Sequence, residues 1–474
     1  MHICGFYGIV KVNICGYLGG FEFHICGEEG FMLFKRKIYE KLIDWKNESK
    51  GDTALLIEGA RRIGKSTVAE EFAKNEYRSY ILIDFAFAPK LVQELFEDVS
   101  DLNYIFLQLQ LHYAVTLHER ESLIIFDEVQ FNPLARQAIK RLVADGRYDY
   151  LETGSLISIK KNVKDILIPS EERRIEMVPM DFEEFLWAKG DYNTVPLLRS
   201  AFDRKVSLGD DLNRKMMRVF REYMLVGGMP QAVSTYIDTN NLMMVDRVKR
   251  DIIDLYEQDF YKIDRTGRVS NMFDSIPAEL SRNSSRYQVS SVLKNDRAST
   301  VMEEIAELSA SKTVLKANHA NDPNIGLATN INPEKFKLYL ADTGLLVSLM
   351  FKDKDFTENI IYSKFLSNKL HKNLGILYEN VVCQTFASRG YKLFYYSYRD
   401  EIASRRFEID FILNDLSKIS PVEVKSASYR KHRSLDEFSI KYSDKIKDKY
   451  VIHTKDFKFE NGVYYLPFYM AQFL

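Results

Sequence analysis

The sequence has few cysteines, no long apolar run and almost no net charge. It contains 4 cysteines in 474 residues, and no apolar run reaches the length that crosses a bilayer. Its first residues lack the basic region and continuous apolar core of a secretory signal peptide. The formal net charge is −1, so no global basic field points to nucleic acid and any basic surface must be local. These absences predict a soluble, cytoplasmic protein without a membrane partner.

Three of the cysteines stand in a glycine-rich leader, at Cys4, Cys15 and Cys26. Each belongs to a near-repeat that offers one sulfur, whereas structural zinc sites usually pair their ligands about two to four residues apart. This spacing disfavours a metal site. Residues 1–33 show no amphipathic pattern, and we expect them to be disordered or to be an extension upstream of a natural start at Met32.

The composition is that of a folded globular protein, with 46% hydrophobic and 28% charged residues. Aromatic residues make up 13% and are spread along the chain, which is typical of a packed core. A length of 474 residues allows about two to four domains.

A phosphate-binding loop is the clearest motif. A short apolar run leads into GARRIGKS at residues 59–66, and a strong helix-forming stretch follows. A helix N-terminus offers unpaired N–H groups and a positive dipole end to phosphates. Gly59 and Gly64 let the backbone turn tightly, while Lys65 can reach the β- and γ-phosphates and Ser66 is placed for Mg²⁺. Strand, loop and helix in this order predict nucleotide binding.

A pair of acidic residues follows a second apolar strand. The apolar run 123–126 is followed by Asp127 and Glu128, at the strand end where open α/β sheets place their ligands. Asp127 would hold Mg²⁺ through its water shell, and Glu128 would act as the general base toward the attacking water. Paired acids after a strand can also form a helix cap and first turn. The upstream phosphate loop favours the catalytic interpretation, which is ATP hydrolysis.

Five apolar segments predict an α/β fold with a parallel sheet, because enough chain for a crossover separates each from the next. They lie at about 54–58, 80–84, 122–127, 148–152 and 174–178. The fourth leads to Thr153 and Ser155, whose hydroxyl groups could sense the γ-phosphate and position the lytic water.

Six segments together resemble a known family. They are EGARRIGKST, IIFDEVQ, TGS, RRIEMVPMDFEEFL, YMLVGGMPQAV and KLYLADTGLL. From about Phe34 to the C-terminus, the chain resembles bacterial and archaeal ATPases of the AAA-type (ASCE) P-loop class that carry a DUF4143 C-terminal region. The resemblance implies ATP and Mg²⁺ as cofactors, with Asp127 and Glu128 as the Walker B pair. The expected nucleotide-binding residues are Gly59, Arg61, Arg62, Gly64, Lys65, Ser66, Thr67, Thr153 and Ser155.

Related ATPases use an arginine on the γ-phosphate that usually comes from a neighbouring subunit, and the sequence does not assign it. The candidates are Arg136, Arg141, Arg173 and Arg174. Each could equally be a solvated surface residue. A second copy of the chain therefore stays open as a partner.

Helical segments follow the predicted ATPase core at 34–190. We expect a helical lid at 191–267, interrupted by the Gly-Gly-x-Pro break at 227–230, and a winged-helix-like segment at 268–350. The third helix of that segment would start at 298–300. It carries acidic residues rather than a basic face, which favours a structural or protein-contact role over DNA contact.

Residues 351–474 hold a second candidate site. Glu379 lies in an expected helix, and two strands alternate at period two so that their charged residues share a face. Asp410 lies in the strand at 407–413, and the next strand carries Glu423 and Lys425. Carboxylates suit Mg²⁺, which can activate water and stabilise charge on a scissile phosphate, and Lys425 would orient that water. The same alternation is typical of any half-exposed strand.

The pattern E…EID…VEVK resembles the PD-(D/E)XK, restriction-endonuclease-like α/β fold. The resemblance implies catalysis by Glu379, Asp410, Glu423 and Lys425, with Asp410 and Glu423 as metal ligands. Flanking basic residues could grip a DNA backbone, although nearby acids could also balance them. These residues are Arg399, Arg405, Arg406, Arg430, Lys431, His432 and Arg433.

Two functions remain open. In the first, the nucleotide state of an Mg²⁺-dependent ATPase controls nucleic-acid cleavage by the C-terminal domain. In the second, the ATPase is a molecular switch that binds DNA or a protein partner, and the nuclease-like domain is a scaffold without cleavage. Intact ligands are necessary for cleavage but not sufficient, so the sequence does not decide between them.

Overall fold

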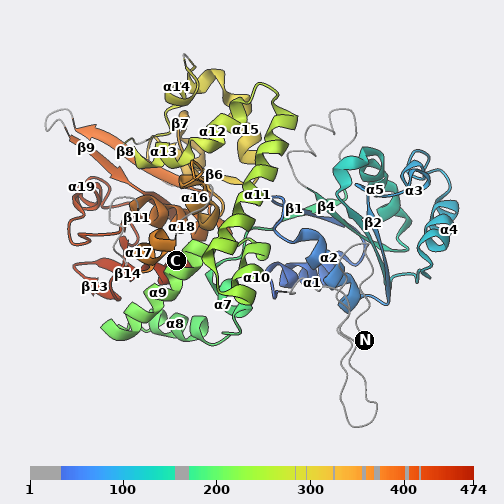
Figure 1. The fold of residues 1–474 in the computed structure, drawn as a ribbon, viewed down its shortest axis with the longest axis horizontal. Coiled ribbons are helices and arrows are strands. Elements are labelled where there is room, and N and C mark those ends of the chain that lie inside the picture. Colours follow the sequence, from blue (N-terminus) through green and yellow to red (C-terminus); the bar gives the residue numbers. More distant parts are fainter. Residues whose placement is uncertain are drawn as a thin grey trace, which may run out of the picture.

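The computed structural model describes residues 34–154, 170–282, 284, 286–294, 296–323, 326–354, 359–367, 374–400, 405–415 and 418–474. The glycine-rich leader with its three cysteines lies outside this range. Figure 1 shows a parallel sheet with its helices on one side of the molecule and the remaining helices and two further sheets on the other. Among the described helices, none combines the length and apolarity needed to cross a membrane.

The first unit is built on five parallel strands in the order β2-β3-β4-β1-β5. The strands are β1 (Ala54–Glu58), β2 (Ser79–Asp84), β3 (Ser122–Asp127), β4 (Asp149–Gly154) and β5 (Glu172–Glu176). The connecting helices are α1 (Ile38–Ser49), α2 (Lys65–Glu76), α3 (Lys90–Glu94), α4 (Leu102–Tyr113), the 3₁₀ turn η1 (Val129–Phe131) and α5 (Pro133–Asp145). The predicted P-loop α/β fold is confirmed.

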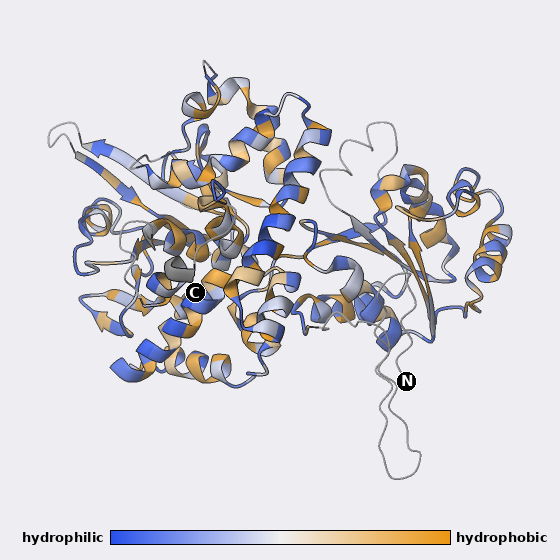
Figure 2. Cartoon of the chain, in the orientation of Figure 1, coloured by the Kyte–Doolittle hydropathy of each residue, from blue (hydrophilic) through white to orange (hydrophobic). Residues whose placement is uncertain are grey.

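Successive side chains of the central strands point to opposite faces of the sheet, and both sets are apolar. This explains why both faces are covered. On β1, Leu55 and Ile57 enter one apolar core, while Ala54 and Leu56 enter another on the opposite face. Figure 2 shows the resulting concentration of apolar residues along these strands. Helix α5 begins with a proline at its first turn and an Asn132 cap, both typical helix starts.

Five helices follow the sheet. They are α7 (Phe182–Ala188), α8 (Thr194–Asp203), α9 (Asp210–Val226), α10 (Pro230–Thr239) and α11 (Leu242–Ile263). Asp181 and Glu184 form a capping box that starts α7. Helix α11 has 22 residues, and Figure 1 shows it between the parallel sheet and the later elements.

The next segment joins short helices to a strand hairpin. Its elements are α12 (Arg268–Asp274), α13 (Ile276–Ser281), α14 (Val289–Val292), η2 (Ala298–Thr300), α15 (Met302–Ala310), β6 (Val314–Ala320), η3 (Leu327–Thr329), β7 (Ile331–Leu340) and α16 (Thr343–Met350). Helices followed by a hairpin agree with the expected order, but β6 also pairs with a later strand in the sheet β7-β6-β8-β9. The winged-helix description stays a prediction.

The C-terminal elements complete that sheet and form a third one. They are α17 (Asn359–Leu366), α18 (Leu374–Ser388), β8 (Phe394–Asp400), β9 (Arg405–Ile409), β10 (Phe411–Asp415), β11 (Lys418–Lys425), α19 (Arg433–Lys441), β12 (Tyr450–His453), β13 (Lys458–Glu460), β14 (Val463–Pro467) and η4 (Phe468–Phe473). The third sheet has the order β10-β11-β12-β14-β13. The single strand expected at 407–413 is divided at Asp410, where the chain passes from one sheet to the other.

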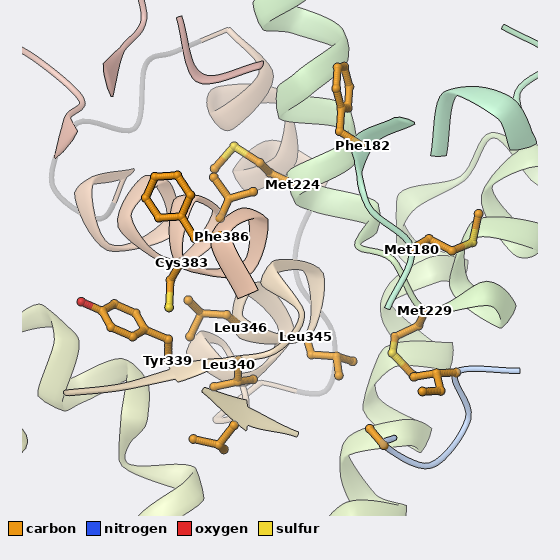
Figure 3. Close-up of a cluster of buried hydrophobic side chains, with 14 of the residues drawn as sticks. Met180, Phe182, Met224, Met229, Tyr339, Leu340, Leu345, Leu346, Cys383 and Phe386 are labelled. Atoms are coloured by element: carbon orange, nitrogen blue, oxygen red, sulfur yellow. The ribbon is translucent and has the colours of Figure 1, made fainter. Parts of the chain in front are cut away.

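One apolar core extends from the parallel sheet through the lid helices to the C-terminal helices. Figure 3 shows part of it, where Met180 and Met229 lie near Leu345, and Leu346 faces Tyr339, Cys383 and Phe386. The two ends of the molecule are therefore packed together rather than joined by an open linker.

Candidate functional site

A cavity of about 900 Å³ lies at the carboxyl end of the parallel sheet, between the loop before α2 and helices α10 and α11. Its lining includes Arg61, Arg62, Gly64, Lys65, Ser66, Thr67, Asp127 and Glu128. The sequence-predicted loop and acidic pair therefore meet in one place. Helix α2 begins at Lys65, so its free N–H groups face this cavity.

Two glycines allow the loop its course. Gly64 has φ +91° and caps α2, a left-handed conformation that side chains disfavour. A Cβ on Gly59 would collide with the backbone carbonyl of Met177, just past β5. The loop can thus pack against the neighbouring chain and still turn into the helix.

Lys65 is buried and donates hydrogen bonds to two carbonyls of its own loop, Gly59 O at 3.2 Å and Ala60 O at 2.9 Å. Burial lowers the pKa of Lys65, although the nearby carboxylates of Glu128 and Asp127 act in the opposite direction. The ammonium therefore lies over the loop, where a phosphate oxygen could replace one of its two carbonyl acceptors.

Oxygen ligands gather where the loop meets β3. Ser66 Oγ donates to Asp127 Oδ1 at 2.7 Å, and the Thr153 hydroxyl donates to the same oxygen. Such hard oxygen groups fit Mg²⁺, so the donor set agrees with the expected cation. Thr153 is fully buried and also accepts the N–H of Glu128 at 3.3 Å, so it positions the acidic pair from behind. The alternative sensor, Ser155, lies outside the described residues.

Glu128 has an unusual backbone conformation. Its φ is +51°, in the left-handed region, at the turn between β3 and η1. The Gln130 side-chain amide donates to its carboxylate. The carboxylate lines the cavity one residue beyond Asp127, which places a base beside the loop.

Contacts from the lid reach the phosphate loop, and sequence reasoning missed them. Tyr256 on α11 donates to Arg61 O at 2.9 Å, and Asp259 pairs with the Arg61 guanidinium at 3.2 Å. Arg36 donates to Ile63 O at 2.8 Å from the other side. These residues are 27 to 198 positions away from their partners, so no local pattern reveals them.

One of the four arginine candidates can be removed. Arg136 is buried, and its guanidinium makes a bidentate pair with Glu172 at 2.9 to 3.1 Å. It therefore stabilises the sheet and cannot reach a nucleotide. The other candidates are more exposed: Arg173 pairs with Glu48, Arg174 with Glu172, and Arg141 donates to Ser100 O.

A second cavity, of about 450 Å³, lies between β7, β9, β11 and α18. Its lining includes Glu379, Asp410, Glu423 and Lys425, so all four residues predicted from the nuclease-like pattern come together. Asp410 Oδ2 accepts the N–H of Val424 at 2.7 Å, and Lys425 Nζ lies 2.5 Å from Glu423 Oε1.

Sequence reasoning missed a lysine at the centre of this second site. Lys337 Nζ lies 2.8 Å from Glu379 Oε1 and 2.6 Å from Glu408 Oε1, and Tyr339 also donates to Glu379. Lys337 and Tyr339 alternate along the strand motif KFKLYL, which is the only sequence signal that could have marked them.

Burial and pairing shift the pKa values of these groups in different directions. Burial would lower the pKa of Lys337, but the carboxylates of Glu379 and Glu408 raise it. Burial would raise the pKa of Glu379, but the Lys337 ammonium lowers it overall. Burial and the charge of Glu379 raise the pKa of Asp410 well above its ordinary value.

The fit of a divalent cation to this second cavity is poor. Across the described ranges, no group of three or more histidine, cysteine, aspartate or glutamate side chains is placed to hold a metal ion. One buried carboxylate oxygen, Glu423 Oε2, lacks a hydrogen-bond partner. The position between Glu379 and Glu408 belongs to the Lys337 ammonium.

Not all of the expected basic residues reach the second cavity. Arg406 lines the second cavity, and Arg282 and Arg286, which the sequence did not single out, line it as well. Arg430 lies over the ring of Tyr429, and Arg433 over the ring of Phe407. The side chain of Arg405 lies outside the described residues.

Comparisons with known proteins match three separate segments of the chain. Residues 51–186 match the family model "AAA domain", residues 217–355 match a domain of unknown function (DUF8612) and residues 374–470 match a second one (DUF4143). No curated protein matches the chain.

Three solved structures are similar in part. A Walker-type ATPase of Pyrococcus abyssi has 16% identity and a TM-score of 0.41, over 67% of this chain and 96% of that one. The RuvB Holliday junction branch migration motor of Thermotoga maritima has 11% identity and a TM-score of 0.28, over 59% and 89%. A STAND protein with a tetratricopeptide repeat sensor from Pyrococcus horikoshii has 10% identity and a TM-score of 0.26, over 76% and 49%. The chain thus joins an AAA-type P-loop ATPase domain to a C-terminal DUF4143 domain.

Proposed function

We propose that this chain is an Mg²⁺-dependent ATPase whose nucleotide state controls its C-terminal region. The observation that carries the proposal is the meeting of Lys65, Ser66, Asp127 and Glu128 in one cavity at the start of α2. A kinase would share the loop, whereas a carboxylate one residue beyond the Mg²⁺ ligand suits a hydrolase that activates water.

Each part of the nucleotide has a complementary group in the cavity. The N–H groups at the start of α2 and the Lys65 ammonium bind the phosphates. Ser66 and Asp127 would hold Mg²⁺, which offsets phosphate charge when bound. Glu128 accepts the proton of the attacking water, and Thr153 keeps the acidic pair in place. Apolar side chains at the rim, Phe34, Pro230 and Ile263, offer a surface for the base.

Helix α11 provides the connection through which nucleotide could act on the C-terminal region. Near its end, Tyr256 and Asp259 contact the phosphate loop. In its first half, Lys249 Nζ donates to Leu225 O at 2.7 Å and to Gly344 O at 3.1 Å. Asp246, also in the first half, accepts from Ser348 Oγ at 2.5 Å. A nucleotide that draws Arg61 away from Asp259 changes the contacts of a helix that also holds α16.

The C-terminal region then acts in one of two ways: it cleaves nucleic acid, or it binds DNA or a protein partner without cleavage. Cleavage of nucleic acid is favoured by the gathering of Glu379, Asp410, Glu423 and Lys425 in one cavity. The ion pairs of Lys337 with two of the cavity's carboxylates favour the second way, a switch whose nuclease-like domain binds without cutting.

The ATPase proposal is tested with fluorescent ATP binding and phosphate release in Mg²⁺. Lys65→Ala should weaken ATP binding by about tenfold or more. Glu128→Gln should bind ATP but hydrolyse it at least about 100-fold more slowly, the usual range for loss of a general base. Glu119→Gln removes an exposed carboxylate outside the cavity and should leave both steps unchanged. Normal hydrolysis by Glu128→Gln would remove it as the base.

The choice between the two C-terminal roles is tested separately. Single- and double-stranded DNA and RNA are incubated with the chain, with and without ATP, and compared with Asp410→Ala and Lys425→Ala. Cleavage that both substitutions abolish would support the nuclease. Binding without cleavage under every condition would support the switch.

A further inference from the structure

The second cavity contains its own positive charge, and that charge comes from outside the DUF4143 match. Lys337 lies on β7, in the segment matched at 217–355, while Glu379 and Glu408 lie in the match at 374–470. The side chain of Lys337 is only 8% exposed, and its ammonium contacts both carboxylates at 2.6 to 2.8 Å. The site is thus assembled from two domains.

Most carboxylates that a metal would need are already engaged by protein donors. Glu379 accepts from Lys337 and from the Tyr339 hydroxyl. Asp410 accepts the N–H of Val424, on the neighbouring strand β11, at 2.7 Å. Glu423 Oε1 lies 2.5 Å from Lys425 Nζ, which leaves only its other oxygen without a partner.

Adding a divalent cation to this arrangement is unfavourable for two reasons. Mg²⁺ keeps several waters in its near-octahedral shell but needs one or two carboxylates. To serve as ligands, Glu379 Oε1, Asp410 Oδ2 and Glu423 Oε1 would have to give up their N–H and O–H donors. The cation would also stand beside the buried ammonium of Lys337, and two positive charges repel strongly where little water screens them. Removing Lys337 instead would leave the carboxylates of Glu379 and Glu408 without their counter-charge.

We propose that Lys337 is a built-in counter-cation that takes the place of a divalent metal in the second cavity, so that the folded domain holds no metal there. The cavity keeps the outline of a nuclease site, but its carboxylates serve to fix β7 against α18 and β9. The inference does not rest on ATP hydrolysis, because it concerns a different cavity and a different set of residues.

The test is a titration of the full chain with Mn²⁺, without nucleotide, followed by calorimetry or electron paramagnetic resonance. All samples carry Asp127→Asn, which removes the carboxylate that would hold a cation at the nucleotide site. The parent should show no saturable Mn²⁺ binding. Lys337→Met should gain one Mn²⁺ site and should melt at a higher temperature with Mn²⁺ than with chelator. Adding Glu379→Gln, which removes a carboxylate that faces Lys337, should abolish both effects. Lys335→Met removes a charge two residues earlier on β7, outside the cavity lining, and should gain nothing.

Two results would overturn the proposal. The first is saturable Mn²⁺ binding by the parent that Glu423→Gln abolishes, which would show that metal and Lys337 coexist. The second is a folded Lys337→Met protein that gains no Mn²⁺ site. If Lys337→Met does not fold, the parent titration still decides, because binding that depends on Glu423 contradicts the proposal and its absence supports it.

Discussion

The carboxylate of Asp342 accepts the backbone N–H of Gly228 at 2.5 Å, although the two residues are 114 positions apart. The same side chain caps α16 through the N–H of Leu345 at 2.8 Å. Met180 N donates to Gly228 O at 2.7 Å on the other side. Three segments, after β5, before α10 and before α16, therefore meet at one glycine. Figure 3 labels Met180, Met229 and Leu345, which belong to or adjoin these segments.

The space at Gly228 predicts the cost of filling it. A Cβ there would collide with the backbone of Met180, which cannot move like a flexible side chain. We expect Gly228→Ala to lower the free energy of unfolding by about 1–3 kcal/mol, as overpacking usually does. Urea unfolding measures the change. Gly375→Ala, whose Cβ would meet only Ser426 Oγ at 3.9 Å, should cause no loss, and equal losses in both variants would contradict the explanation.

The buried amine of Lys249 predicts a pH-dependent stability. Burial lowers its pKa to about 8 in the folded chain from an ordinary value of 10.5, although the nearby carboxylates of Asp246 and Asp342 oppose the shift and Arg250 adds to it. Between these values the unfolded chain holds a proton that the folded chain has released, so stability rises with pH.

The measurement is chemical unfolding from pH 7.5 to 10, comparing the wild type with Lys249→Met. The stability of the wild type relative to the variant should rise by about 1 kcal/mol per pH unit above pH 8. Lys41→Met removes an exposed lysine and controls for the loss of charge. A difference that stays flat or falls with pH would contradict the burial effect.

The ion pair between Arg61 and Asp259 predicts a change in ATP affinity. The Arg61 side chain is 40% exposed, so the pair contributes no more than about 1 kcal/mol. Asp259→Asn should free Arg61 for the phosphates and strengthen ATP binding by up to about fivefold in a fluorescence titration. Asp254→Asn removes an exposed carboxylate from the same helix and should leave the affinity unchanged. Weaker binding by Asp259→Asn would show that Asp259 itself helps to hold the nucleotide.

The buried position of Arg136 predicts a defect of stability. Arg136→Met would leave Glu172 and the neighbouring Glu152 buried without their cation, and breaking such a pair costs about 3–5 kcal/mol. Thermal unfolding should show a large fall, while the exposed Arg141→Met should change little. An Arg136→Met protein of normal stability that bound ATP but no longer hydrolysed it would restore Arg136 as a γ-phosphate contact.

The ATPase half could be predicted closely because its signals are local. The strands β1 and β3 are continuous apolar runs since both faces of the sheet are covered, and the expected bounds 54–58 and 122–127 agree with the structure. Gly64 precedes Lys65 because the turn into α2 needs a positive φ. In each case the residue type follows from neighbours only a few positions away, so the sequence alone is enough to predict the local structure.

The second site could be predicted only in part. The period-two strands brought Asp410 and Glu423 to one cavity as expected, but the sequence did not reveal the break of the strand at Asp410. The Asp410 carboxylate accepts the N–H of Val424 on the neighbouring strand, a contact between residues 14 positions apart that no local pattern marks. Thr153 was expected to face the nucleotide, and the structure buries it behind the acidic pair.

By itself, the sequence determined that this protein has a nucleotide loop, an acidic pair beside it and a set of carboxylates near the C-terminus. Only the tertiary structure decided that Lys337 stands among those carboxylates and that Asp342 holds Gly228. These contacts join residues 42 and 114 positions apart, and their strength comes from burial and pairing, which exist only after the chain has folded.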